Sequence, residues 1–402
     1  MATNILIGLS GGPSVAINAS LAGIMEAAVT SDRIGCIYGS RHGIQGVLHG
    51  DVISLEPYCT PRQLEILCQT PAMALGSCRR KLRQEDLPHI EAVFRQFGIG
   101  QFYYIGGNDS MDTVLQLDRY FKSQGNGVQV IGVPKTIDND LPVTDHTPGF
   151  GSAAKYLYHT MSEIIRDSEI YPVKNVVIVE IMGRNSGWLT LAGGLSHFLG
   201  NPLPQIIALP ETPFDETDFV SRVCSLLEAQ NTVICAVSEG IRDKSGEYIG
   251  MSAKSGVVDN FGHTYLSGVG KYLEALVMNK IGCKVRSIEL NVMQRCSSHL
   301  ASKTDLEEAR EIGRAAVQAG LEGESGVTLT FRRVSNAPYR VEIGSTDVAN
   351  IANLAKDVPE EWLDLENPAV QKEIADYLLP LMQGELSPIR DETGLPLYIQ
   401  MQ

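Results

Sequence analysis

Short apolar runs rich in valine and isoleucine recur along the chain and alternate with segments of helical periodicity. The clearest runs cover residues 4–10, 33–39, 102–107, 128–133, 175–183, 205–210 and 232–240. Their hydrophobicity is continuous rather than alternating, which is typical of strands buried on both faces. The pattern therefore predicts an α/β protein in which helices cover parallel sheets.

Seven or more strand–helix units are more than we expect in a single sheet, so we expect two lobes. The segment LPVTDHTPGFGS (141–152) marks the expected crossing between them. We place a first lobe at residues 1–142, completed by part of 294–340, and a second lobe at 143–293. The acidic residues 341–402 have a helical pattern, which predicts a helical C-terminal extension used in packing or oligomer formation.

Composition and charge narrow the class of protein. The chain has 402 residues, 44% of them hydrophobic, and a formal charge of -14. So acidic a chain favours neither nucleic acid nor an anionic membrane as a partner, and anionic substrates would need local cations. No apolar run approaches the roughly 20 residues of a membrane span. The N-terminus MATNILIGLSGG resembles a strand rather than a leader, so we expect a cytoplasmic protein. The scattered cysteines, with no CxxC pair, predict reduced thiols.

The motif PKTIDND (134–140) is the most informative polar stretch. It follows an apolar run, and ligands bind beyond the carboxyl ends of strands in open α/β sheets. Lys135 offers a cation for a transferring phosphoryl group, and Asp138 offers a carboxylate to accept a hydroxyl proton. Turn chemistry alone would explain the Asn-Asp end of the motif but not the apolar Ile137. The motif therefore predicts a phosphoryl-transfer site.

Two glycine turns each lead from a strand into a predicted helix: LSGGPSVAIN (9–18) and GGNDSMDTV (106–114). Helix N-termini with free N–H groups favour anions, although such a turn can equally be only a tight connection. Neither turn has the GxGxxG or GK[ST] pattern, which weighs against dinucleotide and Walker-type sites. Asp109 places a negative charge in the mouth of the second turn, and that charge requires an explanation.

Cationic motifs follow several other predicted strands or turns. In LGSCRRKL (75–82), Arg79 is the candidate phosphate ligand, whereas Arg80 and Lys81 fit a solvated surface equally well. The stretches EIMGRNSGWL (180–189), SEG (238–240) and KVRSIELNVMQR (284–295) are ordinary individually. Together they offer arginines and a carboxylate, a combination suited to a sugar phosphate.

This ordered set of motifs resembles the phosphofructokinase family from Ile5 to about residue 310. The resemblance implies a phosphofructokinase fold of two Rossmann-like, three-layer lobes with mostly parallel sheets. It implies that the first lobe binds the phosphoryl donor, the second mainly fructose 6-phosphate, and that Mg²⁺ lies between them. It also implies that Asp138 accepts the proton of the C1 hydroxyl of the sugar.

Within this family, Asp109 indicates the donor. ATP-using members typically have GGDGS, in which the second glycine makes room for the α-phosphate, whereas this chain has Asp109 at that position. A carboxylate there would repel and exclude the α-phosphate, so the donor expected is pyrophosphate. Lys135, where ATP-using members usually have glycine, and Pro13 agree with this. We therefore expect reversible, Mg²⁺-dependent transfer from pyrophosphate to fructose 6-phosphate, giving fructose 1,6-bisphosphate and phosphate in glycolysis.

The resemblance assigns site residues by their roles. The predicted catalytic residues are Asp138, Lys135 and Asp109, and the predicted metal ligands are Asn108 and Asp109. The predicted pyrophosphate ligands are Gly11, Gly12, Arg79, Gly107 and Lys135. The predicted sugar-phosphate ligands are Thr136, Ile137, Asp138, Met182, Gly183, Arg184, Glu239, Arg286 and Arg295.

Some positions depart from the family pattern. Asn108 replaces the usual magnesium-binding aspartate, Asn175 replaces an arginine that reaches a neighbouring subunit, and Val292 replaces a histidine. Ala22 and Glu26 stand where allosteric members have effector-binding arginines, so we expect no allosteric control at that site. Sites shared between subunits in this family imply a homodimer or homotetramer.

Three alternatives remain open from the sequence. An ATP-dependent 6-phosphofructokinase stays open because some family members with a lysine in PKTIDND use ATP, but Asp109 opposes it. A catalytically silent regulatory subunit that binds sugar phosphates is opposed by the presence of Asp138 and Lys135. A nicotinamide-dependent oxidoreductase is weakened by the missing GxGxxG pattern.

Overall fold

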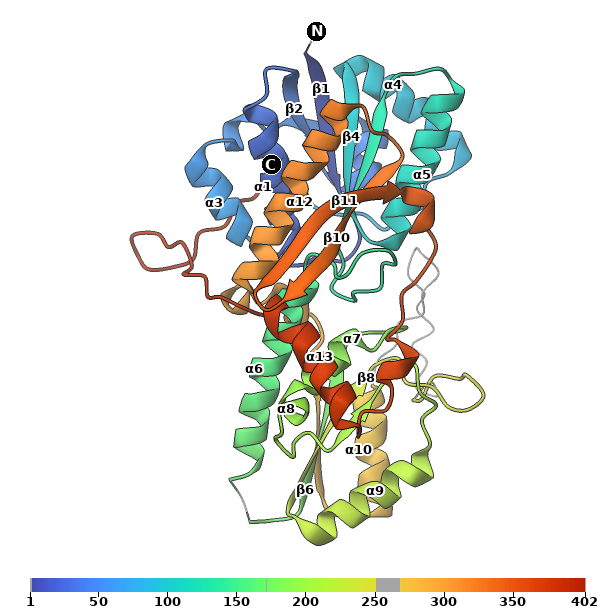
Figure 1. The fold of residues 1–402 in the computed structure, drawn as a ribbon, viewed down its shortest axis with the longest axis vertical. Helices are drawn as coiled ribbons and strands as arrows, with labels where there is room; N and C mark the ends of the chain where they lie inside the picture. Colours follow the sequence, from blue (N-terminus) through green and yellow to red (C-terminus); the bar gives the residue numbers. More distant parts are fainter. Residues whose placement is uncertain (1, 171, 251–267, 402) are drawn as a thin grey trace.

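The first lobe is built on a seven-stranded sheet with the strand order β11-β10-β5-β4-β1-β2-β3. The computed structural model describes residues 2–170, 172–250 and 268–401, and it has two lobes one above the other (Figure 1). Only the edge strands β3 and β11 run antiparallel to their neighbours. The strands are β1 (Thr3–Leu9), β2 (Ile34–Ser40), β3 (Val52–Ser54), β4 (Ile99–Gly106), β5 (Gln129–Pro134), β10 (Val327–Asn336) and β11 (Tyr339–Asp347).

Helices cover both faces of this sheet. One apolar cluster joins the sheet to α1, α3 and the long helix α12, which lies in front of the sheet in Figure 1, and another joins the opposite face to α2, α4 and α5. The central strands β1 and β4 are almost wholly buried, as their continuous hydrophobicity predicts. The helices are α1 (Ile17–Val29), α2 (Gly43–His49), α3 (Pro61–Gln69), α4 (Leu87–Phe97), α5 (Asn108–Ser123) and α12 (Lys303–Glu322).

The second lobe has a four-stranded, wholly parallel sheet with the order β7-β8-β6-β9. Its strands are β6 (Asn175–Ile181), β7 (Ile206–Ala208), β8 (Thr232–Ser238) and β9 (Lys284–Glu289). Its helices are α6 (Phe150–Ser168), α7 (Trp188–Gly193), α8 (Leu195–Phe198), α9 (Glu216–Ala229), α10 (Val269–Lys280) and α11 (Met293–Cys296). Helices α6 to α8 share one apolar cluster, and α9 and α10 share another on the opposite face.

The predicted fold class is confirmed. All the apolar runs named above coincide with strands, and helices lie on both faces of each sheet. All eight cysteines have free thiols. None of the described helices is both long and apolar enough to cross a bilayer.

The prediction of a helical extension over residues 341–402 was wrong at its start. Residues 341–347 belong to β11, because an exposed hairpin strand with alternating burial has too little apolar content to stand out in the sequence. The chain then passes through α13 (Pro368–Leu381), which packs on the second lobe. It finally returns to the first lobe, where the N–H groups of Ile399 and Met401 donate to Thr70 Oγ1 and the Ala74 carbonyl.

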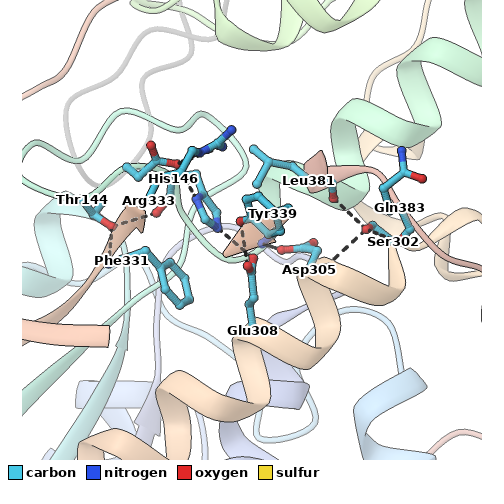
Figure 2. A network of polar contacts seen from close by, with 12 residues as sticks. Thr144, His146, Ser302, Asp305, Glu308, Phe331, Arg333, Tyr339, Leu381 and Gln383 are labelled. Carbon is cyan, nitrogen blue, oxygen red and sulfur yellow. Dashed lines mark hydrogen bonds and ion pairs between the residues drawn. The ribbon is translucent and has the colours of Figure 1, made fainter. Parts of the chain in front are cut away.

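A buried polar network joins the two lobes beside the crossing segment (Figure 2). Nδ1 and Nε2 of His146 lie 2.8 Å from a carboxylate oxygen of Asp145 and of Glu308, respectively. The imidazole stacks on Phe331 with ring centroids 4.7 Å apart. Burial opposes a charge on His146, but the hydrogen bonds to the two carboxylates outweigh it and raise the pKa of His146. The His146 ring thus bridges the crossing to α12, and the two carboxylates favour its protonated form.

Candidate active site

The site forms where the carboxyl ends of the central strands of both lobes meet. The first glycine turn follows β1, the motif PKTIDND follows β5, and the polar ends of β6 and β8 lie opposite them. Thr136 pairs with Gly149 at the start of α6, and Ile137 packs into the apolar cluster of the second lobe. The apolar residue that turn chemistry could not explain therefore anchors the motif to the second lobe.

Lys135 lies directly beneath the first glycine turn. Its ammonium group donates to the carbonyl of Gly12 at 2.6 Å, and a Cβ added at Gly11 would be 3.2 Å from Lys135 Nζ. Gly11 has a φ of 78°, a conformation that glycine adopts without strain. Burial lowers the pKa of Lys135 to about 8, although the carboxylate of Asp138 partly offsets this effect. The turn therefore presents its backbone and a buried ammonium group to the same space.

Asp138 faces charged side chains from both lobes. Its backbone N–H donates to Thr136 Oγ1 at 3.1 Å, which fixes the loop locally. Burial, followed by the negative charge of Glu239, raises the pKa of Asp138 to about 6, and Lys135 and Arg184 oppose the shift. A carboxylate with a pKa near neutrality is suited to accept a proton at physiological pH.

The opposite wall is a tight turn after β6. The N–H of Gly183 donates to Glu239 Oε1 at 3.3 Å, and the hydroxyl of Ser238 donates to the Gly183 carbonyl at 2.6 Å. Gly183 has a φ of 129°, and a Cβ there would be 2.5 Å from the Ser186 carbonyl oxygen. The N–H of Met182 is held by Gln294 Oε1 at 3.0 Å. These contacts bring Met182, Gly183 and Glu239 together as the sequence predicted.

Guanidinium groups from separate segments converge on this space. Arg295 Nη1 is 3.3 Å from the position of a Cβ added at Gly12. Burial and the neighbouring positive charge of Arg79 lower the pKa of Arg295. The buried Nε of Arg184 has no hydrogen-bond partner among the described residues. Cations held close together favour binding of an anion between them.

The second glycine turn leads into α5, with Gly107 at the N-cap and Asp109 in the first turn. The amide of Asn108, predicted to bind metal, instead contacts the C-terminal part of the chain. Its nitrogen donates to the Leu354 carbonyl, and its oxygen accepts the N–H of Asn353 at 2.6 Å. Since both polar groups of the amide are engaged, the structure does not support Asn108 as a metal ligand.

The structure does not bring Arg286 to the site. Arg286 lies opposite Val177 in the register of β6 and β9, well before the carboxyl end of β6. Its guanidinium is instead 3.9 Å from Asp167. Within one chain, the strand and the following turn carry Arg286 and Arg295 to different ends of the lobe. Arg80, which the sequence left open, pairs with Asp86 at 2.6 Å.

Several residues around the site have only a weak signal, or none, in the sequence. Gln294 is buried and holds Met182, and its place beside Arg295 was the only signal for it. Asp140 was given no role in the predicted site, but burial and the charge of Asp138 raise the pKa of Asp140 to about 7. The N–H of Lys356 donates to the carbonyl of Asp140 at 2.7 Å. No motif marks Lys356, because its contacts come from the path of the chain after β11.

Known proteins resemble this chain along its whole length. Residues 4–320 match the family described as Phosphofructokinase. A "Pyrophosphate--fructose 6-phosphate 1-phosphotransferase" of Xanthomonas campestris is 38% identical, covering 99% of this chain and 96% of that protein. One of Methylococcus capsulatus is 37% identical, covering 100% and 96%. The crystal structure of a pyrophosphate-dependent phosphofructokinase from Nitrosospira multiformis, 35% identical, matches with a TM-score of 0.89 over 100% of this chain and 96% of that one. The chain therefore belongs to the phosphofructokinase family.

Proposed function

We propose that this protein is a pyrophosphate-dependent 6-phosphofructokinase that transfers a phosphoryl group reversibly to the C1 hydroxyl of fructose 6-phosphate. The products are fructose 1,6-bisphosphate and phosphate. The presence of both Asp109, at the start of α5, and Lys135, under the first glycine turn, carries the proposal. The names of the full-length relatives support the same donor and acceptor.

The roles proposed for the residues follow from their positions. Asp138 accepts the proton of the C1 hydroxyl while the hydroxyl oxygen attacks a pyrophosphate phosphorus and inorganic phosphate departs. Lys135, Arg79 and the backbone N–H groups of the two glycine turns stabilise the donor. Because desolvation strengthens each of these contacts, the buried position of Lys135 suits this role.

The proposed sugar phosphate lies against the second lobe. Arg184 and Arg295 supply the cations, and Glu239 supplies a carboxylate for the sugar hydroxyls. Thr136, Ile137, Met182 and Gly183 complete the wall on which the sugar would lie. Arg286 is left out of this set because of its distance along the strand.

Mg²⁺ fits this site only in part through protein ligands. The described residues contain no cluster of three or more His, Cys, Asp or Glu side chains that could hold a metal ion. Mg²⁺ in phosphoryl-transfer sites is usually held by one or two carboxylates together with phosphate oxygens. We assign Asp109 as the protein ligand, and the bound ion would neutralise charge on the pyrophosphate.

The expected effector site of allosteric relatives is closed by ion pairs. Glu26 Oε2 lies 2.9 Å from Arg310 Nε and 2.5 Å from Arg314 Nη2, both on α12. Burial opposes the charge, but the two arginines outweigh it and lower the pKa of Glu26. An anionic effector would have to displace this carboxylate, which supports an enzyme without allosteric control at this site.

We further propose that the protein is cytoplasmic, forms a homodimer or homotetramer, and has no nucleic-acid or membrane partner. Light scattering would test the oligomeric state.

A donor assay tests the proposed function directly. Purified protein with fructose 6-phosphate and Mg²⁺ should form fructose 1,6-bisphosphate with pyrophosphate and not with ATP at equal concentration. In the reverse direction, fructose 1,6-bisphosphate and phosphate should yield pyrophosphate. Turnover with ATP alone would favour the ATP-dependent alternative, and binding of sugar phosphate without turnover would favour the regulatory subunit.

A further inference from the structure

The chain after β11 runs along the candidate active site and contacts both lobes. We name residues 353–358 the strap; it lies between the short helical turns η5 (Val348–Asn350) and η6 (Glu360–Trp362). The strap lies beyond residues 4–320, which match the phosphofructokinase family, whereas the Xanthomonas and Methylococcus relatives match almost the whole chain. The strap therefore lies outside the residues that the chain shares with the whole family.

We propose that the strap is a positioning element for the pyrophosphate site, acting through the amide of Asn108 on the neighbouring Asp109. This proposal rests on the proposed function. It concerns how the start of α5 is held, and it assigns no contact between the strap and a substrate.

The contacts of Asn108 select an amide at this position. Its nitrogen donates to the Leu354 carbonyl, and its oxygen accepts the Asn353 N–H at 2.6 Å. An ionised aspartate could accept from Asn353 but could not donate, and its second oxygen would face the Leu354 carbonyl. The amide therefore matches the donor and acceptor that the strap presents. This match gives a physical reason for asparagine in the motif GGNDS.

Asn353 adds a second link to α5. Its side-chain nitrogen donates to Asp112 Oδ1 at 2.9 Å, one turn along the same helix. Asn353 has a φ of 62°, in the left-handed region that asparagine tolerates better than most residues. Just before the strap, the buried Val348 and Ile351 pack into the apolar cluster that covers α5. The segment is thus fixed against α5 by both apolar and polar contacts.

The other end of the strap holds the catalytic loop and the second lobe. Besides the bond from its N–H to the Asp140 carbonyl, Lys356 donates from Nζ to the carbonyls of Thr144 and Asp145 at 3.1 and 2.9 Å. The Lys356 carbonyl accepts the indole N–H of Trp188 at 3.2 Å. The strap therefore ties the first turn of α5 to the loop that carries Asp138, so the two carboxylates keep a fixed relation.

Removing the clamp at Asn108 should loosen the first turn of α5 while the fold remains intact. Asn108 is only half-buried, and α5 keeps its buried face. A less well-positioned Asp109 should weaken productive binding of pyrophosphate without affecting the sugar wall, which lies mainly against the second lobe and includes no residue of α5. The expected signature is a change specific to the donor.

The test compares Asn108→Ala and Asn353→Gly with the wild-type enzyme. For Asn108→Ala we expect KM for pyrophosphate to rise about tenfold with KM for fructose 6-phosphate within about twofold. Asn353→Gly keeps the backbone N–H and tolerates the positive φ but loses the bond to Asp112, so a smaller rise of about threefold is expected. Because Asn353 belongs to no predicted metal or substrate site, this variant separates positioning from any loss of a ligand.

Asn350→Ala is the matched control. Its amide donates to Thr346 Oγ1 at 2.9 Å within the same segment, and it should leave both KM values unchanged. Because Asp109 is the proposed protein ligand of Mg²⁺, the half-saturating Mg²⁺ concentration should rise together with KM for pyrophosphate in Asn108→Ala and Asn353→Gly and stay unchanged in Asn350→Ala. The urea midpoint should match the wild type in all variants. Unchanged KM for pyrophosphate in Asn108→Ala and Asn353→Gly, or an equal rise in both KM values, would overturn the proposal. If the wild-type enzyme itself fails to use pyrophosphate, the proposed function fails before this comparison begins.

Discussion

Asp109 is the side chain on which the choice of donor depends. We predict that Asp109→Gly raises kcat/KM with ATP, because it removes a negative charge and opens space at the start of α5. It should also lower kcat/KM with pyrophosphate by roughly 10²-fold, as expected for losing a group that helps to position charge in the site. Initial rates with each donor at saturating fructose 6-phosphate measure both effects. No gain with ATP would show that the carboxylate is not the barrier.

Two groups of the site should set the pH dependence of the reaction. Asp138, whose pKa is about 6, must lose its proton to act as a base, and Lys135, whose pKa is about 8, must keep its proton to stabilise the donor. We therefore predict that kcat/KM for pyrophosphate rises with pH through about 6 and falls through about 8. Lys135→Arg should remove the alkaline limb even if the rate is lower, because guanidinium stays protonated. A limb that persists in this variant belongs to another group.

The sequence located the site residues better than it located their contacts. Lys135, Asp138, Gly183 and Glu239 come together because each directly follows a buried strand, and strand ends can be found from apolar runs. The partners of Asn108, in contrast, are more than 240 residues away in the sequence. Pairings across such a distance depend on the path of the whole chain, so the resemblance to the family predicted a metal ligand instead.

The same division holds for the elements. Strands buried on both faces were predictable because their hydrophobicity is continuous, as in β6, where every residue is buried. The partly exposed β9 and the second half of β10 alternate between accessible and less accessible positions. These short edge segments have too few apolar residues to be separated from loops by pattern alone.

Helix α6 should depend on a carboxylate from α12. Gly149 is at the N-cap of α6 and has no side chain to cap the helix, and Asp305 Oδ1 accepts its N–H at 2.8 Å. Asp305 Oδ2 also accepts the N–H of Ser152 at 3.0 Å. We predict that Asp305→Ala lowers the free energy of unfolding by about 3 kcal/mol, because it leaves buried donors of the first turn unpaired.

Urea denaturation followed by circular dichroism measures this effect. Asp391→Ala is a comparison of the same type in an exposed turn, and it should change the stability by less than about 1 kcal/mol. If both substitutions changed the free energy of unfolding equally, Asp305 would not act as a cap of α6 from the other lobe. Asp305 also touches no predicted substrate residue, so any change in KM should be small.

At the scale of the whole molecule, the lobes are held by charged groups as well as by apolar packing. His146 stands on the crossing segment and Glu308 on α12, and Tyr339 from β11 donates to the other oxygen of Glu308 at 2.7 Å (Figure 2). Arg333 from β10 pairs with Asp145 at 3.0 Å. The crossing segment, α12 and the β10–β11 hairpin therefore meet at one imidazole ring whose protonated form is favoured, and a change in its charge should affect the whole molecule.

We predict that His146→Gln lowers the free energy of unfolding by about 3 kcal/mol near pH 6, as expected for removing one partner of a buried ion pair. The pKa of His146 is raised in the folded protein, so its contribution is fully present below its unfolded pKa of about 6.5 and is lost as pH rises through the folded value. Asp145 has a lowered pKa, because the hydrogen bond and charge of His146, together with Arg333, outweigh its burial. Its contribution is lost only as pH falls below about 4. The difference in free energy of unfolding between wild type and variant should therefore be largest between about pH 4 and 6.5 and should shrink at alkaline pH.

Urea unfolding at several pH values measures this difference. The exposed His89→Gln on α4 is the control, and its free energy of unfolding should stay within about 0.5 kcal/mol of wild type. A difference that grows with pH would mean that the imidazole acts as a neutral hydrogen-bonding group and that the lobes are joined without its charge.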